Sequence, residues 1–137
     1  MAKERKPMSL NHSDPCLRND EDEAAIRELL SRIGDKWSVL VIVALAKSPK
    51  RRARFSVLEK MIPGISQRML TATLRSLERD GLLIRELFPE VPPRVEYELT
   101  PLGFSLLDTL KRLVAWVSKN WLEVKEARKK FDLVKKK

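Results

Sequence analysis

The sequence predicts a mainly α-helical domain that carries one small β-hairpin. Three observations indicate this fold class. Apolar residues recur at helical spacing in segments that begin at capping side chains and end at glycine. After Gly81 the spacing becomes the alternation typical of strands, interrupted by the proline-rich stretch 89–93. The chain has 137 residues, a length that suits one domain.

The N-terminal half of the predicted domain begins with two helices. The first is expected to start at an N-cap near Asp20, with Glu23 closing a capping box, and to end at Gly34. Asp35 is the next predicted N-cap. The run 39–46 that follows is apolar on every side, so a helix there must be buried all round. Its β-branched residues would also suit a buried strand, but the cap and the length favour a helix.

Two shorter helices joined by a tight turn are predicted in the middle of the chain. The first covers 56–62 and is expected to bury Val57, Leu58, Met61 and Ile62. Proline and glycine at 63–64 predict a sharp turn. Ser66 is the predicted N-cap of the second helix, which runs to about Asp80. Gly81 takes the position after its end, where positive φ favours glycine.

A hairpin and a last helix complete the predicted domain. Strands are expected over 82–88 and 94–100, with 89–93 projecting as a loop too long for a two-residue turn. Thr100 and Pro101 predict a helix start, with a capping hydroxyl followed by proline. The last helix carries an apolar seam: Leu106, Leu110, Leu113, Val117, Trp121 and Val124, widened by Leu107, Val114 and Trp116.

The order of these elements predicts a winged helix-turn-helix, and the helix over about 66–80 has a face suited to DNA. Its inner face is expected to hold Met69, Leu70, Thr73, Leu74 and Leu77, and its outer face Gln67, Arg68, Thr71, Arg75 and Arg79. Arginine can bind guanine edges and glutamine adenine edges in the major groove, while Ser66 and the helix N-terminus hold a phosphate. The alternative is a solvated polar face, which every surface helix has.

Basic residues outside this helix offer further contacts to a nucleic acid. Arg94 lies at the far end of the loop 89–94, where a wing would meet the minor groove or the backbone; the alternative is a solvated hairpin residue. Residues 47–54 are expected to form a basic connector, either solvated or in contact with phosphate through Lys50, Arg51, Arg52 and Arg54.

Composition narrows the class of protein. The formal net charge is +9, from 28 Lys and Arg against 19 Asp and Glu. This balance suits a polyanion such as nucleic acid, although an anionic membrane surface or solubility alone would also account for it. No secretion signal or membrane span is visible, so a cytoplasmic protein with no membrane partner is expected. The chain has one cysteine, Cys16, so it cannot form an internal disulfide. With His12 as its one histidine, we expect no metal site, no cofactor and no catalytic constellation.

Seven pieces of the sequence together resemble the HxlR family of bacterial and archaeal regulators. They are Cys16, LSRIGDKW (30–37), RFS (54–56), IPGISQRML (62–70), LRSLERDGL (74–82), PEVPPRVEY (89–97) and LTPLG (99–103). The likeness covers about 16–120. It implies a MarR-like winged-helix transcription regulator, with the recognition helix beginning at Ser66, a wing over 89–94, and Lys36 near the DNA backbone. The basic connector looks longer than in the family, which leaves the start of the helix-turn-helix open.

The resemblance further implies a homodimer that binds a pseudo-palindromic operator in double-stranded DNA. The expected subunit interface comprises Ile26, Leu29, Leu106, Leu110, Leu113, Val117 and Trp121. The chain then divides into a flexible arm (1–19), the winged helix with its dimerisation helices (20–124), and a basic tail (125–137). Several family members sense oxidants or electrophiles through a cysteine near the N-terminus, and Cys16 sits at the matching position; the alternative is a small half-buried residue that packs the arm against the dimer. No residue identifies a small-molecule effector.

The sequence is also compatible with two other classes of function, a protein-binding or RNA-binding module and an enzyme. The same fold can serve as a protein-binding or RNA-binding module, because fold does not fix function. An enzyme is the least supported class, since the chain lacks a glycine-rich phosphate loop and an evident catalytic pair.

Overall fold

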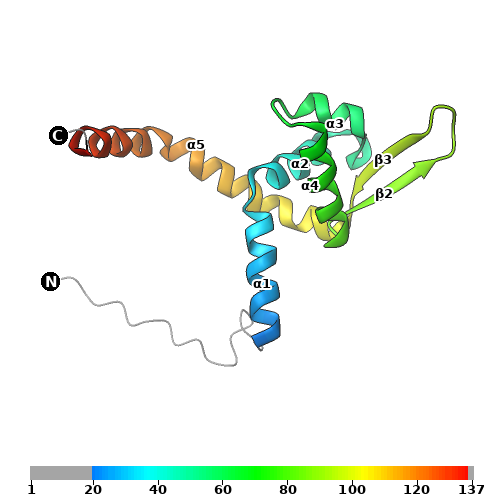
Figure 1. Ribbon diagram of the computed structural model, residues 1–137, viewed down its shortest axis with the longest axis horizontal. Coiled ribbons are helices and arrows are strands. Elements are labelled where there is room, and N and C mark those ends of the chain that lie inside the picture. Colours follow the sequence, from blue (N-terminus) through cyan, green and yellow to red (C-terminus); the bar gives the residue numbers. More distant parts are fainter. Residues whose placement is uncertain (1–19, 136–137) are drawn as a thin grey trace.

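The computed structural model describes residues 20–135, which form a helical body with a protruding hairpin and a long C-terminal helix (Figure 1). The elements in order are α1 (Asp20–Ile33), α2 (Lys36–Lys47), the 3₁₀ turn η1 (Pro49–Arg51), β1 (Arg52–Arg54), α3 (Phe55–Met61), α4 (Gln67–Arg79), β2 (Leu83–Phe88), β3 (Arg94–Leu99) and α5 (Pro101–Lys135). The predicted fold class, mainly α with a hairpin wing, is confirmed.

The hairpin belongs to an antiparallel sheet of three strands, in the order β1-β3-β2. In the register, Ala53 of β1 pairs with Tyr97 of β3, and Leu83 of β2 pairs with Leu99. The prediction of a connector at 47–54 was therefore wrong for its last three residues. Only the middle residue of β1, Ala53, is buried. One alternation between two arginines gives too little periodicity to reveal a strand.

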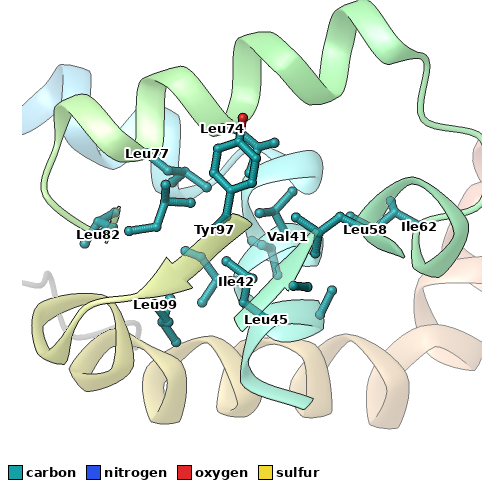
Figure 2. Close-up of a cluster of buried hydrophobic side chains, with 14 of the residues drawn as sticks. Val41, Ile42, Leu45, Leu58, Ile62, Leu74, Leu77, Leu82, Tyr97 and Leu99 are labelled. Carbon is teal, nitrogen blue, oxygen red and sulfur yellow. The ribbon is translucent and has the colours of Figure 1, made fainter. Parts of the chain in front are cut away.

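The core lies where α2, α3 and α4 meet the sheet (Figure 2). Asp35 caps α2 as predicted, accepting a hydrogen bond from the Ser38 backbone N–H at 3.3 Å. The helix is largely enclosed, although Leu40 remains 42% exposed, so the expectation of burial all round was wrong at that residue. The core side chains that are almost fully buried include Val41, Ile42, Leu45, Leu58, Ile62, Leu70, Leu74, Leu77, Leu83 and Leu110.

The short helix α3 contributes less to this core than its sequence suggests. Leu58 is fully buried and Ile62, directly after the helix, is 2% exposed. Val57 and Met61, which were also predicted to be buried, are 43% and 39% exposed. A helix of two turns can present only one narrow stripe to the core, and Leu58 and Ile62 occupy that stripe at i and i+4.

The start of α5 is fixed against the end of the helix-turn-helix. Thr100 caps it as predicted: its hydroxyl accepts a hydrogen bond from the Gly103 N–H at 3.1 Å and donates one to the Gly81 carbonyl at 2.7 Å. Gly103 is required by close packing, because a Cβ there would lie 2.0 Å from the Leu82 carbonyl oxygen. Gly81 itself has φ +75°, as expected after the end of α4.

Helix α5 is longer than predicted. It continues past Val124 to Lys135, so 125–135, expected to be a basic tail, is helical. After Gly103 the sequence contains no glycine or proline, and Lys, Glu, Arg and Leu are strong helix formers. The second half of α5 projects away from the body (Figure 1). None of the described helices combines the length and apolar character that crossing a bilayer requires.

Candidate nucleic-acid interface

Helix α4 presents a polar face to solvent because its opposite face is anchored in the core. Leu70, Leu74 and Leu77 are at most 1% exposed, which fixes the rotation of the helix. The side chains predicted for the outer face are all exposed: Gln67, Arg68, Thr71, Arg75 and Arg79. Met69, predicted to face inward, is 43% exposed, since it lies at the edge between the two faces.

The N-terminus of α4 is capped as predicted. The Ser66 hydroxyl oxygen accepts a hydrogen bond from the Met69 backbone N–H at 3.0 Å. The turn before it depends on Gly64, which has φ +86°. The Trp37 ring lies beside this turn, 4.0 Å from where a Cβ on Gly64 would be. The Lys36 amino group stands 4.4 Å above the centre of the Trp37 ring, so the fold brings Lys36 near the start of α4.

The other end of α4 is tied to α1. Arg32 donates to both carboxylate oxygens of Asp80, at 2.6 and 2.7 Å, and to Glu28 at 2.9 Å. The hydrogen bond to Asp80 is the main cause that raises the pKa of Arg32 above its usual value, opposed by partial desolvation. Arg79 lies 3.5 Å from Glu28 and is 72% exposed. Arg79 therefore sits in this α1–α4 contact, away from the helix N-terminus.

The wing is held together by its own side chains. Arg94 was predicted to meet DNA, but it is 27% exposed and its guanidinium is engaged within the wing. It lies 3.3 Å from Glu90, 3.4 Å from Glu96 and 4.1 Å from the centre of the Phe88 ring. Sequence reasoning missed this because the partners come from both strands and from the loop.

The basic connector separates into residues with different roles. Arg54 is exposed at the start of α3, beside a shallow depression that residues 90–95 of the wing also line. Arg51 stacks on Phe104 of α5, 3.4 Å from the ring centre. Arg52 turns toward three glutamates of the wing, and its pKa is raised chiefly by a hydrogen bond to Glu86. A free, solvated connector was therefore a poor description of this segment.

The helices α1 and α5 leave a large apolar surface without a partner in the described part of the chain. Of the predicted interface residues, Ile26, Leu29, Leu113, Val117 and Trp121 are 39–51% exposed. Two others lie elsewhere: Leu110 is 1% exposed in the core, and Leu106 packs against that core. Both helices also expose apolar side chains that sequence reasoning did not assign to the interface: Leu30, Leu122, Phe131, Leu133 and Val134.

Two predicted features lie outside the described residues. Cys16, the tentative redox site, and His12 belong to 1–19, as does the expected arm. Within 20–135, no three His, Cys, Asp or Glu side chains gather in a group that could hold a metal ion.

Comparison with known proteins places this geometry among transcription regulators. The sequence model of the HxlR-like helix-turn-helix family matches residues 32–126. An uncharacterized HTH-type transcriptional regulator of Methanothermobacter thermautotrophicus is 44% identical over 105 residues, 77% of this chain and 78% of that protein. Among solved structures, the regulator YtfH of Salmonella typhimurium has a TM-score of 0.68 at 41% identity, covering 75% of this chain and 89% of that one. The redox regulator HypR in its reduced form has a TM-score of 0.65 at 33% identity, covering 74% and 98%.

Proposed function

The chain belongs to the HxlR-like helix-turn-helix family of transcriptional regulators, and from this premise we propose that it acts as a homodimer on a pseudo-palindromic DNA operator. The outer face of α4 carries this proposal. Its five polar side chains are exposed while three leucines lock the opposite face in the core. In a dimer, two such helices would enter major grooves about 34–36 Å apart, one helical turn of DNA.

Each exposed group has a proposed role at the duplex. Gln67, Arg68, Thr71 and Arg75 read base edges, because arginine and glutamine form paired hydrogen bonds with guanine and adenine. Ser66, Lys36 and Arg54 contact phosphates on either side of the groove. Arg79 is placed for a backbone contact at most, since it lies at the far end of α4 beside Glu28. Arg94 orders the wing that approaches the neighbouring backbone.

The test is a titration of labelled duplexes followed by fluorescence anisotropy over a salt series. The duplexes are the sequence upstream of the protein's own gene and a scrambled version of it. We expect saturable binding, tighter to the upstream duplex, that weakens steeply with salt as counterions are released. Equal, salt-insensitive binding to both duplexes would instead support a protein-binding module.

Ser66 separates helix stability from DNA contact. Ser66→Ala removes the cap and should lower the free energy of unfolding by about 1 kcal/mol. Ser66→Asp keeps an oxygen acceptor for the Met69 N–H and suits the helix dipole, so stability should be retained. Its negative charge should nevertheless weaken DNA binding by repelling phosphate. Chemical denaturation and anisotropy measure the two effects. Full DNA affinity in Ser66→Asp would show that no phosphate lies at this helix end.

A redox response is a second proposal, supported by the likeness to the redox regulator HypR. Oxidation by a reagent such as diamide would join Cys16 of two subunits or, alternatively, join Cys16 to a small thiol in a mixed disulfide. In either case two thiol protons and two electrons pass to the oxidant. We expect diamide to change the DNA affinity of the wild type, reversibly with dithiothreitol, and to leave Cys16→Ser unaffected. A wild-type affinity that diamide does not alter would contradict this proposal.

A further inference from the structure

The solvent-facing side of the three-stranded sheet carries a cluster of opposite charges, here called the wing cluster. It consists of Arg52, Glu86, Glu90, Arg94, Glu96 and Glu98. The register explains how they meet: Arg52 lies opposite Glu98, and Glu86 lies opposite Glu96. Side chains alternate along a strand, so the five members that lie on strands share one face while Tyr97 turns to the core, and Glu90 joins them from the loop through Arg94.

Arg52 is the member of the wing cluster that joins all three strands. From β1 it hydrogen-bonds Glu86 on β2, and on β3 it lies 3.5 Å from Glu96 and 3.7 Å from Glu98. Its guanidinium also stands 5.5 Å from the centre of the Phe88 ring. Only 21% of the Arg52 side chain is exposed. A planar guanidinium with five donors can serve several carboxylates at once, which an ammonium cannot.

The strands need this cation because their carboxylates oppose one another. Glu86 and Glu96 are direct cross-strand partners, and like charges in that arrangement destabilise a sheet. Arg94 neutralises the end near the loop through Glu90 and Glu96. Glu86 and Glu98 have no ion pair other than Arg52 within the described part of the chain. Without Arg52, the base of the hairpin would hold carboxylates that repel.

The strand that carries Arg52 leads directly into the helix-turn-helix. β1 ends at Arg54 and α3 begins at Phe55, so the backbone joins the wing cluster to the helix that precedes α4. β1 has only three residues, and few backbone hydrogen bonds hold it to the sheet. The side-chain contacts of Arg52 therefore add to this connection on the charged face of the sheet, while Leu83, Tyr97 and Leu99 hold the opposite face in the core.

We propose that Arg52 is a positioning residue for DNA binding, which fixes the orientation of the wing relative to α4 through the wing cluster. It acts without touching DNA, since its guanidinium is occupied by carboxylates. The expected effect on affinity rests on the proposed DNA-binding function. The ordering of the wing by Arg52 is a property of the free protein and does not depend on it. A wing ordered in advance does not have to be ordered on binding, so affinity is higher.

Three variants test this role: Arg52→Gln, Arg52→Lys and, as a control of equal charge change on the same strand, Arg54→Gln. Amide hydrogen exchange of the DNA-free proteins reports the wing directly. In Arg52→Gln we expect faster exchange over 84–98, with unchanged protection in α2, which shows that the fold is intact. Arg52→Lys should exchange at a rate between this variant and wild type, because lysine keeps the positive charge but lacks the planar guanidinium that binds several carboxylates. Arg54 lies opposite Glu96 but forms no ion pair within the described part of the chain, so Arg54→Gln should exchange as wild type does.

DNA titrations over a salt series give the second readout. For Arg52→Gln we expect affinity to fall roughly tenfold at every salt concentration, with the slope against log salt unchanged, because no phosphate contact is lost. Arg54→Gln should instead reduce the slope by about 0.9, the value for one phosphate contact. A reduced slope in Arg52→Gln, or wing exchange equal to wild type, overturns the proposal. If wild-type protein fails to prefer any duplex, the proposed function fails, while hydrogen exchange still decides whether Arg52 orders the wing.

Discussion

Alanine at Arg68 or at Arg75 is expected to weaken operator binding by about 1–3 kcal/mol and to relax base preference at the position that the side chain reads. Both arginines are exposed on the outer face of α4, one in its first turn and one two turns later. Their spacing of seven residues is close to two helical turns, so they lie on one line facing the groove. Anisotropy titrations against operators with single base-pair changes measure both effects.

Arg112→Ala is the matched control for charge. Arg112 is 82% exposed on α5 and pairs with Asp108 on its own helix, and the substitution removes one positive charge as the α4 variants do. We expect it to leave base preference unchanged and affinity nearly so. Operator affinity equal to wild type in both Arg68→Ala and Arg75→Ala would show that this face of α4 does not read DNA.

The elements predicted well from sequence are those whose signals are local. Asp35, Ser66 and Thr100 each cap a helix within three residues of themselves, and the hydrogen bonds are where the sequence predicts them. The apolar stripe of α4 is also local, since Leu70, Leu74 and Leu77 follow helical spacing. Such short-range chemistry reveals both the helix and the face it exposes.

The features that sequence reasoning missed depend on contacts between distant segments. Arg52 and Glu86 are 34 residues apart, and Arg32 and Asp80 are 48 apart. The sequence shows which residues carry charge, but only the sheet register brings these partners together. Arg94 illustrates the consequence, because its ion pairs with Glu90 and Glu96 cannot be predicted from its place beside the loop.

The seam of α5 has a related ambiguity. One face of the helix carries Leu106, Leu110, Leu113, Val117 and Trp121, spaced without a break. In the structure the first two pack in or against the core of their own chain, while the last three lie beyond it, 43–51% exposed. Periodicity identifies a buried face but does not tell which molecule buries it. The point where α5 leaves the body determines which of these residues pack in their own chain and which remain exposed.

Glutamate at Val117 is therefore expected to dissociate the proposed homodimer. Val117 is 51% exposed, with Leu113 four residues before it and Trp121 four residues after it. A carboxylate at the centre of this apolar stripe would be buried without a partner, at a cost of about 2 kcal/mol or more per subunit interface. Leu110, which packs in the core, is seven residues before Val117 and is not changed, so the fold of the monomer should persist. Sedimentation velocity measures the dimer, and circular dichroism the fold.

Lys119→Gln is the control for Val117→Glu, because it changes the net charge by the same amount from an exposed position on the opposite side of α5. It should remain a dimer with its operator affinity changed little. Val117→Glu should instead sediment as a monomer and lose most of its operator affinity, since a single recognition helix can occupy only one half-site. If Val117→Glu dimerises as tightly as wild type, the subunit interface does not lie on this face of α5. A Val117→Glu monomer that binds the full operator as tightly as wild type would show that DNA recognition does not need the second subunit.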